Sequence, residues 1–127
     1  MNDKKKEQLK GNLVEMGLME QKEALLECVQ ANYRKRELGV FWKWKQGWIY
    51  FTEKQMIYPL GLLEEAIVIP YSSIRRIEKF SASLIPMGMA ITYDAPKTGD
   101  ETEAKFTISK RDKWIAFLSE KAGLSVG

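Results

Sequence analysis

Basic and aromatic residues alternate in one short stretch of the chain, residues 33–48 (YRKRELGVFWKWKQGW). Cations attract anionic lipid headgroups, and indole rings sit readily at a membrane–water boundary. Trp and Tyr are also residue types that anchor protein–protein interfaces. We therefore take this stretch as a candidate patch for binding a lipid or a protein partner, made of Arg34, Lys35, Arg36, Trp42, Lys43, Trp44 and Lys45.

Alternation divides the second half of this patch between two sides. Successive side chains of an extended chain point in opposite directions, so Lys43 and Lys45 lie opposite to Trp42 and Trp44. One interpretation places the indoles outward, as anchors for a ligand. The other packs the aromatic residues into the core and leaves the charges on a solvated rim. The residues alone leave both interpretations open.

Charge alone would hold the protein on a membrane only weakly. Each basic residue near an anionic surface contributes ~1 kcal/mol, so the basic residues of the patch together contribute about 4–5 kcal/mol. That free energy corresponds to a dissociation constant near the millimolar range. We therefore expect protein–protein or self-association first, with binding of an anionic, phosphoinositide-like headgroup as the alternative.

Single-stranded nucleic acid is a third candidate ligand, because small β-barrels bind it with basic and aromatic residues. The cations are few, the net charge of the chain is only +3, and no RNP-like or KH-like signature occurs. These features argue against a nucleic-acid partner.

The residue inventory gives catalysis little support. The chain has no His, which removes the commonest general base and the commonest metal ligand. Its single cysteine, Cys28, cannot build a thiolate zinc site, and its apolar surroundings favour burial over a nucleophilic role. The phosphate-binding patterns GxxxxGK[ST] and GxGxxG are absent. We expect a non-enzymatic protein with no cofactor, no metal and no small-molecule substrate.

The bulk composition is that of one soluble globular domain. The chain has 127 residues, of which 45% are hydrophobic and 29% are charged. No apolar run approaches the ~20 residues that a membrane-spanning helix needs. The first residues lack the apolar core of a secretory signal, and one cysteine cannot form an internal disulfide. We expect a cytoplasmic location, with peripheral membrane contact if lipid is the ligand.

Short runs rich in β-branched and aromatic residues, separated by Gly, Pro and charged residues, predict a series of strands. The runs are residues 48–52, 55–58, 66–69, 74–80, 87–93 and 104–108, and a loop is predicted over 94–102. One helix is predicted over 3–16, ending at Gly17, with the apolar anchors Leu9, Leu13 and Met16. A second is predicted over 109–123, with Ser109 as a candidate N-cap.

The segment from Gly47 to Ile77 resembles the central hairpins of GRAM domains, which have the pleckstrin-homology-like (PH-like) fold. The residues that carry the resemblance are Trp48, Tyr50, Phe51, Thr52, Met56, Ile57, Ile69, Pro70, Tyr71, Ile74 and Ile77. The resemblance implies a mainly β (α+β) fold, an antiparallel β-barrel or bent sheet capped by a C-terminal amphipathic helix. Residues 20–127 would form a single PH-like, GRAM-type domain after an N-terminal helical extension over residues 1–19.

The same resemblance implies roles for two parts of the chain. Trp114 and Phe117 would plug the core from the C-terminal helix. The stretch 33–48 would join the first two strands, and that connection carries basic residues in the phosphoinositide-binding members of the wider fold.

Local and long-range signals disagree over residues 20–36. Good helix formers and an apolar residue at every fourth position favour a helix. The resemblance instead implies the first strand from about Ala24 onward, because a PH-like barrel needs a strand before Gly47. We predict a strand, with one side formed by Leu25, Glu27, Val29, Ala31 and Tyr33.

Overall fold

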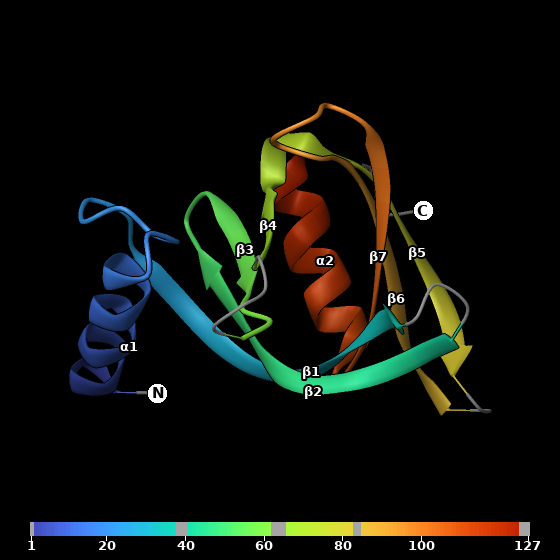
Figure 1. Ribbon diagram of the computed structural model, residues 1–127, viewed down its shortest axis with the longest axis horizontal. Helices are drawn as coiled ribbons and strands as arrows, with labels where there is room; N and C mark the ends of the chain where they lie inside the picture. Colours follow the sequence, from blue (N-terminus) through green and yellow to red (C-terminus); the bar gives the residue numbers. More distant parts are fainter. Residues whose placement is uncertain (1, 38–40, 62–65, 83–84, 125–127) are drawn as a thin grey trace.

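Seven antiparallel strands form one strongly bent sheet, with a helix near each end of the described chain (Figure 1). The computed structural model describes residues 2–37, 41–61, 66–82 and 85–124, and the side chains of residues 35–37, 41–43, 82, 85 and 86 also lie outside the described part. The elements are α1 (Asp3–Glu15), β1 (Leu25–Glu37), β2 (Phe41–Thr52), β3 (Gln55–Tyr58), β4 (Ile67–Pro70), the 3-10 turn η1 (Tyr71–Ser73), β5 (Ile74–Ala82), β6 (Ile85–Asp94), β7 (Glu101–Ile108) and α2 (Arg111–Ala122).

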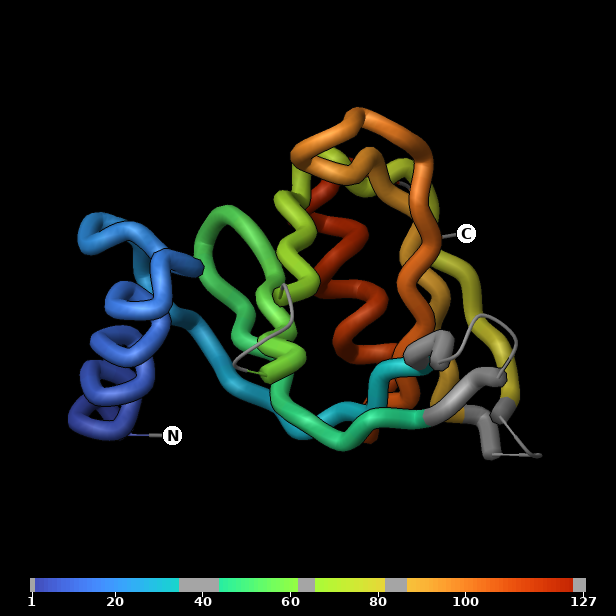
Figure 2. The backbone as a smooth tube through the Cα atoms, viewed as in Figure 1, coloured from blue at the N-terminus to red at the C-terminus, as the bar shows by residue number. Residues whose placement is uncertain are grey.

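Strand β1 joins the two halves of the sheet, whose strand order is β4-β3-β2-β1-β7-β6-β5. It pairs with β2 along nearly its whole length, but with β7 only at Ala31, Asn32 and Tyr33. Figure 2 shows the backbones of β1 and β2 bending together below α2. In the described residues the two edge strands, β4 and β5, do not pair with each other. The predicted mainly β fold is confirmed, and the sheet is bent rather than closed.

The disputed segment is a strand from Leu25 onward, as predicted. Backbone pairing with β2 and the packing of Val29, Ala31 and Tyr33 against the core outweigh its helix propensity. Leu25 departs from the predicted side, because the register shifts between Leu25 and Glu27. This irregularity moves Leu25 into a second apolar cluster below α1.

Helix α2 fills the space inside the bend (Figure 1). Its Trp114 ring stacks on Phe51 of β2, with ring centroids 4.5 Å apart and planes 4° apart. Phe117 meets the same Phe51 ring edge-on at 5.3 Å, and Leu118 is fully buried. The prediction that Trp114 and Phe117 plug the core is confirmed.

The start of α2 differs from the prediction. Ser109 is not the N-cap: the helix begins at Arg111, and Lys110 occupies the N-cap position in a left-handed conformation with φ 57° and no side-chain cap. Arg111 instead makes contacts outside the helix, since its Nη1 donates to the carbonyls of Phe80 at 3.1 Å and Gly88 at 3.3 Å. The helix is therefore attached to the β5–β6 hairpin by a guanidinium group. At its other end Gly123 has the left-handed conformation that the sequence predicts.

Helix α1 packs on a smaller apolar cluster, away from α2 (Figure 1). Leu13 is buried there with Met19, Leu25 and Ile57, and Leu9 packs against them. Met16, the third predicted anchor, is 53% exposed, so that part of the prediction is wrong. The helix ends at Glu15, and Gly17 takes the predicted left-handed conformation.

Most of the remaining elements agree with the sequence, but β2 begins at Phe41 instead of Trp48, so the stretch 33–48, expected to join the first two strands, lies mainly within β1 and β2 themselves. The loop predicted over 94–102 occupies the connection between β6 and β7, apart from Asp94, which ends β6, and Glu101 and Thr102, which begin β7. Glu64 and Glu65, which the sequence places in a turn, lie outside the described residues. No helix in the described part of the chain has the length and apolar character needed to cross a membrane.

The packing of α2 yields a stability prediction. Trp114→Ala removes a ring that is 7% exposed and stacked on Phe51. We expect the free energy of unfolding, measured by urea denaturation, to fall by about 3–5 kcal/mol. Trp48→Ala is the matched control, because Trp48 is 48% exposed. Similar losses for both variants would contradict the role of α2 as the core plug.

Candidate functional site

The candidate patch lies on the hairpin formed by β1 and β2. Backbone pairing sets Arg34 opposite Trp44, Lys35 opposite Lys43 and Arg36 opposite Trp42. The side chains of Lys35, Arg36, Trp42 and Lys43 lie outside the described part of the chain. The structure therefore brings all these positions together along one ladder, but describes the side chains of Arg34, Trp44 and Lys45 alone.

Lys45 is directed toward the inner side of the hairpin. Its partner in the ladder, Tyr33, packs on Tyr58 and Phe106 with ring centroids 5.7 Å and 5.4 Å apart. The Lys45 ammonium donates to the carbonyl of Leu60, in the segment after β3. The cation is half-buried and already bound to a backbone oxygen, so it is a poor contributor to a surface patch.

The outer side of the hairpin carries two exposed indoles. Trp44 is 39% exposed and Trp48 is 48% exposed. Gln46 lies between them on β2, and Asn32 and Gln30 lie opposite on β1. We call these residues the indole face: Gln30, Asn32, Trp44, Gln46 and Trp48. All of them are exposed, which answers for Trp44 the question that alternation left open.

Strands far away in the sequence extend this face. Trp44 stacks on Phe80 of β5, with ring centroids 6.4 Å apart and planes 13° apart. Lys105 of β7 places its Nζ 5.4 Å from the centre of the Phe80 ring. Sequence reasoning missed both residues, because only the bend of the sheet brings β5 next to the β1–β2 hairpin.

A tyrosine hydroxyl fixes the hairpin at the point where the sheet bends. Tyr58 of β3 donates to the carbonyl of Lys45 at 2.7 Å and lies 3.2 Å from the carbonyl of Ala31. Gly47 sits opposite Ala31 in the ladder and leaves room for the ring. Burial raises the pKa of Tyr58 to about 12, so the phenol stays protonated and remains a donor at neutral pH.

Neither a metal-binding cluster nor a readily ionised thiol occurs among the described residues. They contain no group of three His, Cys, Asp or Glu side chains that could hold a metal ion. Cys28 is half-buried, and burial, followed by the neighbouring Glu27 charge, raises the pKa of its thiol to about 11. The thiolate, which is the reactive form, is therefore scarce at neutral pH.

Comparison with solved structures establishes the fold. The C-terminal domain of an unknown protein from Leishmania infantum aligns over 91% of this chain and 95% of its own, with a TM-score of 0.64 and 15% identity. The Slm1-PH domain in complex with inositol-4-phosphate aligns over 77% of this chain and 95% of its own, with a TM-score of 0.57 and 9% identity.

A third similar structure holds the DH/PH domains of PDZ-RhoGEF in complex with GTP-γ-S-activated RhoA. It aligns over 91% of this chain with a TM-score of 0.60 and 12% identity, and this chain spans only 33% of its length. The chain therefore has a PH-like fold. No protein-family model matches the sequence, and no curated protein sequence does. The resemblance to GRAM domains in particular stays a prediction.

The contact between Gly47 and Tyr58 generates a prediction. A Cβ atom added at Gly47 would lie 2.5 Å from the Tyr58 hydroxyl oxygen and 2.8 Å from the ring carbon that bears it. We expect Gly47→Ala to lower the free energy of unfolding by about 1–3 kcal/mol, because the ring must shift away from both carbonyls.

Gly11→Ala is the matched control for that measurement. A Cβ atom at Gly11, inside α1, meets nothing within 4 Å. This variant should gain about 0.5–1 kcal/mol from the better helix propensity of Ala. A Gly47→Ala protein as stable as the wild type would show that the bend does not depend on the Tyr58 contact.

Proposed function

We propose that this chain is a non-enzymatic, cytoplasmic binding module of the GRAM type that associates with another protein, in the first instance a second copy of itself. Residues 20–127 form the binding domain, and residues 1–19 form a helical extension. The absence of His from the sequence and the raised pKa of Cys28 both support a binding role over a catalytic one.

The two exposed indoles of the indole face carry this proposal. Large aromatic side chains with this much exposed surface are costly in water and typically mark an interaction surface. Trp is enriched among the residues that dominate protein–protein binding energy. Trp44 is further held in place by its stack on Phe80, so little conformational entropy is lost when it binds a partner.

The residues around the indoles favour a protein partner over a lipid surface. Gln46, Gln30 and Asn32, which lie between the two indoles, are uncharged, whereas Arg34, opposite Trp44, and Lys105, beside Phe80, place charges toward one edge of the face. An uncharged centre with a charged rim is the usual arrangement of a protein–protein interface. Asn32 already donates from its Nδ2 to the Thr107 hydroxyl at 3.3 Å, which orders the β1–β7 side of the face. A flat, polar-lined aromatic surface on two paired strands is well suited to contact a second such surface.

Anionic lipid is the second candidate ligand, and one observation favours it. The backbone ladder concentrates Arg34, Lys35, Arg36 and Lys43 at the end of one hairpin. The similar Slm1-PH domain was solved with inositol-4-phosphate. With the Lys45 ammonium bound to Leu60, the other four cations supply at most about 4 kcal/mol at an anionic surface. That is too little for stable attachment without a headgroup pocket or an oligomer.

Self-association is tested by light scattering after size exclusion, from micromolar to near-millimolar protein. We expect a reversible dimer that Trp48→Ser weakens at least about tenfold, because truncating an anchor indole costs ~2 kcal/mol or more. Met16→Ser is the matched control, since it also removes an exposed apolar side chain, but from the end of α1. A strict monomer at every concentration, or equal effects of both variants, would refute self-association through the indole face.

Lipid binding is tested by co-sedimentation with vesicles that contain phosphatidylserine and phosphoinositide. If lipid is the ligand, Arg36→Glu/Lys43→Glu abolishes sedimentation, whereas Lys113→Glu/Lys121→Glu, with the same charge change on α2, retains it. The hairpin variant spares Lys45 because that side chain contacts Leu60. Wild-type protein that stays in the supernatant would eliminate the lipid candidate.

A further inference from the structure

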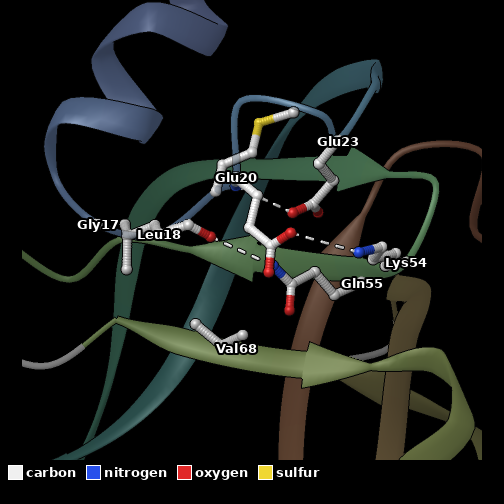
Figure 3. A pocket seen from close by; sticks show the side chains of 8 residues that line it. Gly17, Leu18, Glu20, Glu23, Lys54, Gln55 and Val68 are labelled. Carbon is white, nitrogen blue, oxygen red and sulfur yellow. Dashed lines mark hydrogen bonds and ion pairs between the residues drawn. The ribbon is translucent and has the colours of Figure 1, made fainter.

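A pocket of about 290 Å³ lies between the segment that follows α1 and the start of β3 (Figure 3). Its polar groups come from Glu20, Glu23, Lys54 and Gln55. None of these residues belongs to the indole face, so the pocket is a separate feature of the molecule.

Glu23 is an unusual residue for such a place, because it is only 1% exposed. One carboxylate oxygen, Oε1, accepts the backbone N–H of Glu20 at 3.2 Å. The other, Oε2, is buried and has no hydrogen-bond partner among the described residues. A buried carboxylate oxygen without a donor costs free energy, and such a cost is commonly retained where a ligand later supplies the donor.

The charges around the pocket do not balance. Lys54 pairs with Glu20, at 3.6 Å between Nζ and Oε2, and both side chains are largely exposed. Figure 3 shows this pair beside Glu23, which forms no ion pair among the described residues. Two carboxylates and one ammonium leave one negative charge unmatched. The nearby Tyr71 hydroxyl does not serve Glu23, because it donates to the Thr52 carbonyl at 2.7 Å.

The unmatched charge of Glu23 also affects the pKa of a neighbouring side chain, Tyr71. Burial and, after it, the charge of Glu23 raise the pKa of the Tyr71 hydroxyl. Glu23 is itself buried, and a charge away from water attracts a cation more strongly than it would in water.

The rest of the pocket selects the kind of cation. Leu18, Met19 and Val68 supply an aliphatic wall. Gln55 donates from its Nε2 to the Leu18 carbonyl at 3.2 Å, which fixes this wall and leaves the amide oxygen as a further acceptor. A metal ion would need more ligands than the described residues provide here. An alkyl chain that ends in an ammonium group matches both the wall and the acceptors.

We propose that this pocket binds a primary alkylammonium group, that of a lysine side chain of a partner protein, through the Glu23 carboxylate. The methylene chain lies against Leu18 and Val68. The last torsion of a Glu side chain is broad, so the carboxylate turns to present Oε2 as the ammonium enters. The ammonium supplies the hydrogen-bond donor that Oε2 lacks and neutralises the unmatched charge of Glu23.

The experiment is an NMR titration of the full chain with Nα-acetyl-lysine methylamide, followed through the backbone amides of Glu20, Glu23 and Gln55. We expect saturable shifts with a dissociation constant of about millimolar, as suits a fragment of this size. The norleucine analogue, which keeps the alkyl chain and lacks the charge, should produce no saturable shift. Putrescine tests whether a free amine is the source instead.

Two variants separate binding from folding. Glu23→Gln keeps the acceptor for Glu20 and removes the charge, so it should weaken binding at least about tenfold and raise the melting temperature. Lys54→Met changes an exposed residue and removes a competing ammonium, so it should tighten binding several-fold. Glu120→Gln, an exposed change on α2, should alter neither quantity.

Any one of the following results would overturn the proposal. The lysine probe fails to saturate, or the norleucine analogue binds equally well. Glu23→Gln leaves the affinity unchanged or lowers the melting temperature, and the latter would mean that Oε2 has a stabilising partner within the chain. Lys54→Met has no effect on affinity. Putrescine binds while the lysine probe does not, which would make the ligand a free amine. Because the test uses no residue of the indole face, its outcome is independent of the self-association experiment.

Discussion

One buried phenol holds the bend on which the whole sheet depends. The Tyr58 hydroxyl reaches the carbonyls of Lys45 and Ala31, one on each strand of the long hairpin. Ala31 is also where β1 begins to pair with β7, opposite Ile108. Tyr58 of β3 therefore contacts both β2 and β1 at the place where β1 also begins to pair with β7. Gly47 makes this possible, because any larger residue at that position would displace the ring.

Both faces of the hairpin follow from this arrangement. On the inner side, Tyr33 is drawn into the core beside Tyr58 and Phe106. On the outer side, the bend carries the start of β2 toward β5, so that Trp44 rests on Phe80 while Trp48 stays exposed. The candidate binding surface is thus the outer side of the β1–β2 hairpin, whose inner side packs against the core.

Much of the architecture could be predicted from the sequence, because strict alternation and a broad apolar helix face are local patterns. The strands from β2 to β7 and the plug made by Trp114 and Phe117 are of this kind. The misplaced cap at Ser109 has a different cause. The Arg111 guanidinium binds two carbonyls of the β5–β6 hairpin, and no local pattern reports a contact across such a distance in sequence.

The candidate site was also predictable only in part, because contacts between residues distant in the sequence leave no local pattern. Composition marks the stretch 33–48, but the contact of Lys45 with Leu60 and the stack of Trp44 on Phe80 depend on the bend. Leu25 changed sides because of a register shift, and a single irregularity of this type reverses a pattern with a period of two. The Glu23 pocket has no sequence signature at all, since a lone Glu in a polar turn looks like any solvated residue.

The pairing of β1 with β7 also bears on how the protein is made. Asn32 and Thr107, which face each other across these strands, are separated by 75 positions in the chain. Asn32 leaves the ribosome long before Thr107. Until β7 has been synthesised, one edge of β1 stays unpaired and the apolar residues of the first hairpin stay exposed. Because residues of α2 belong to the main core, that core closes only after α2 has emerged.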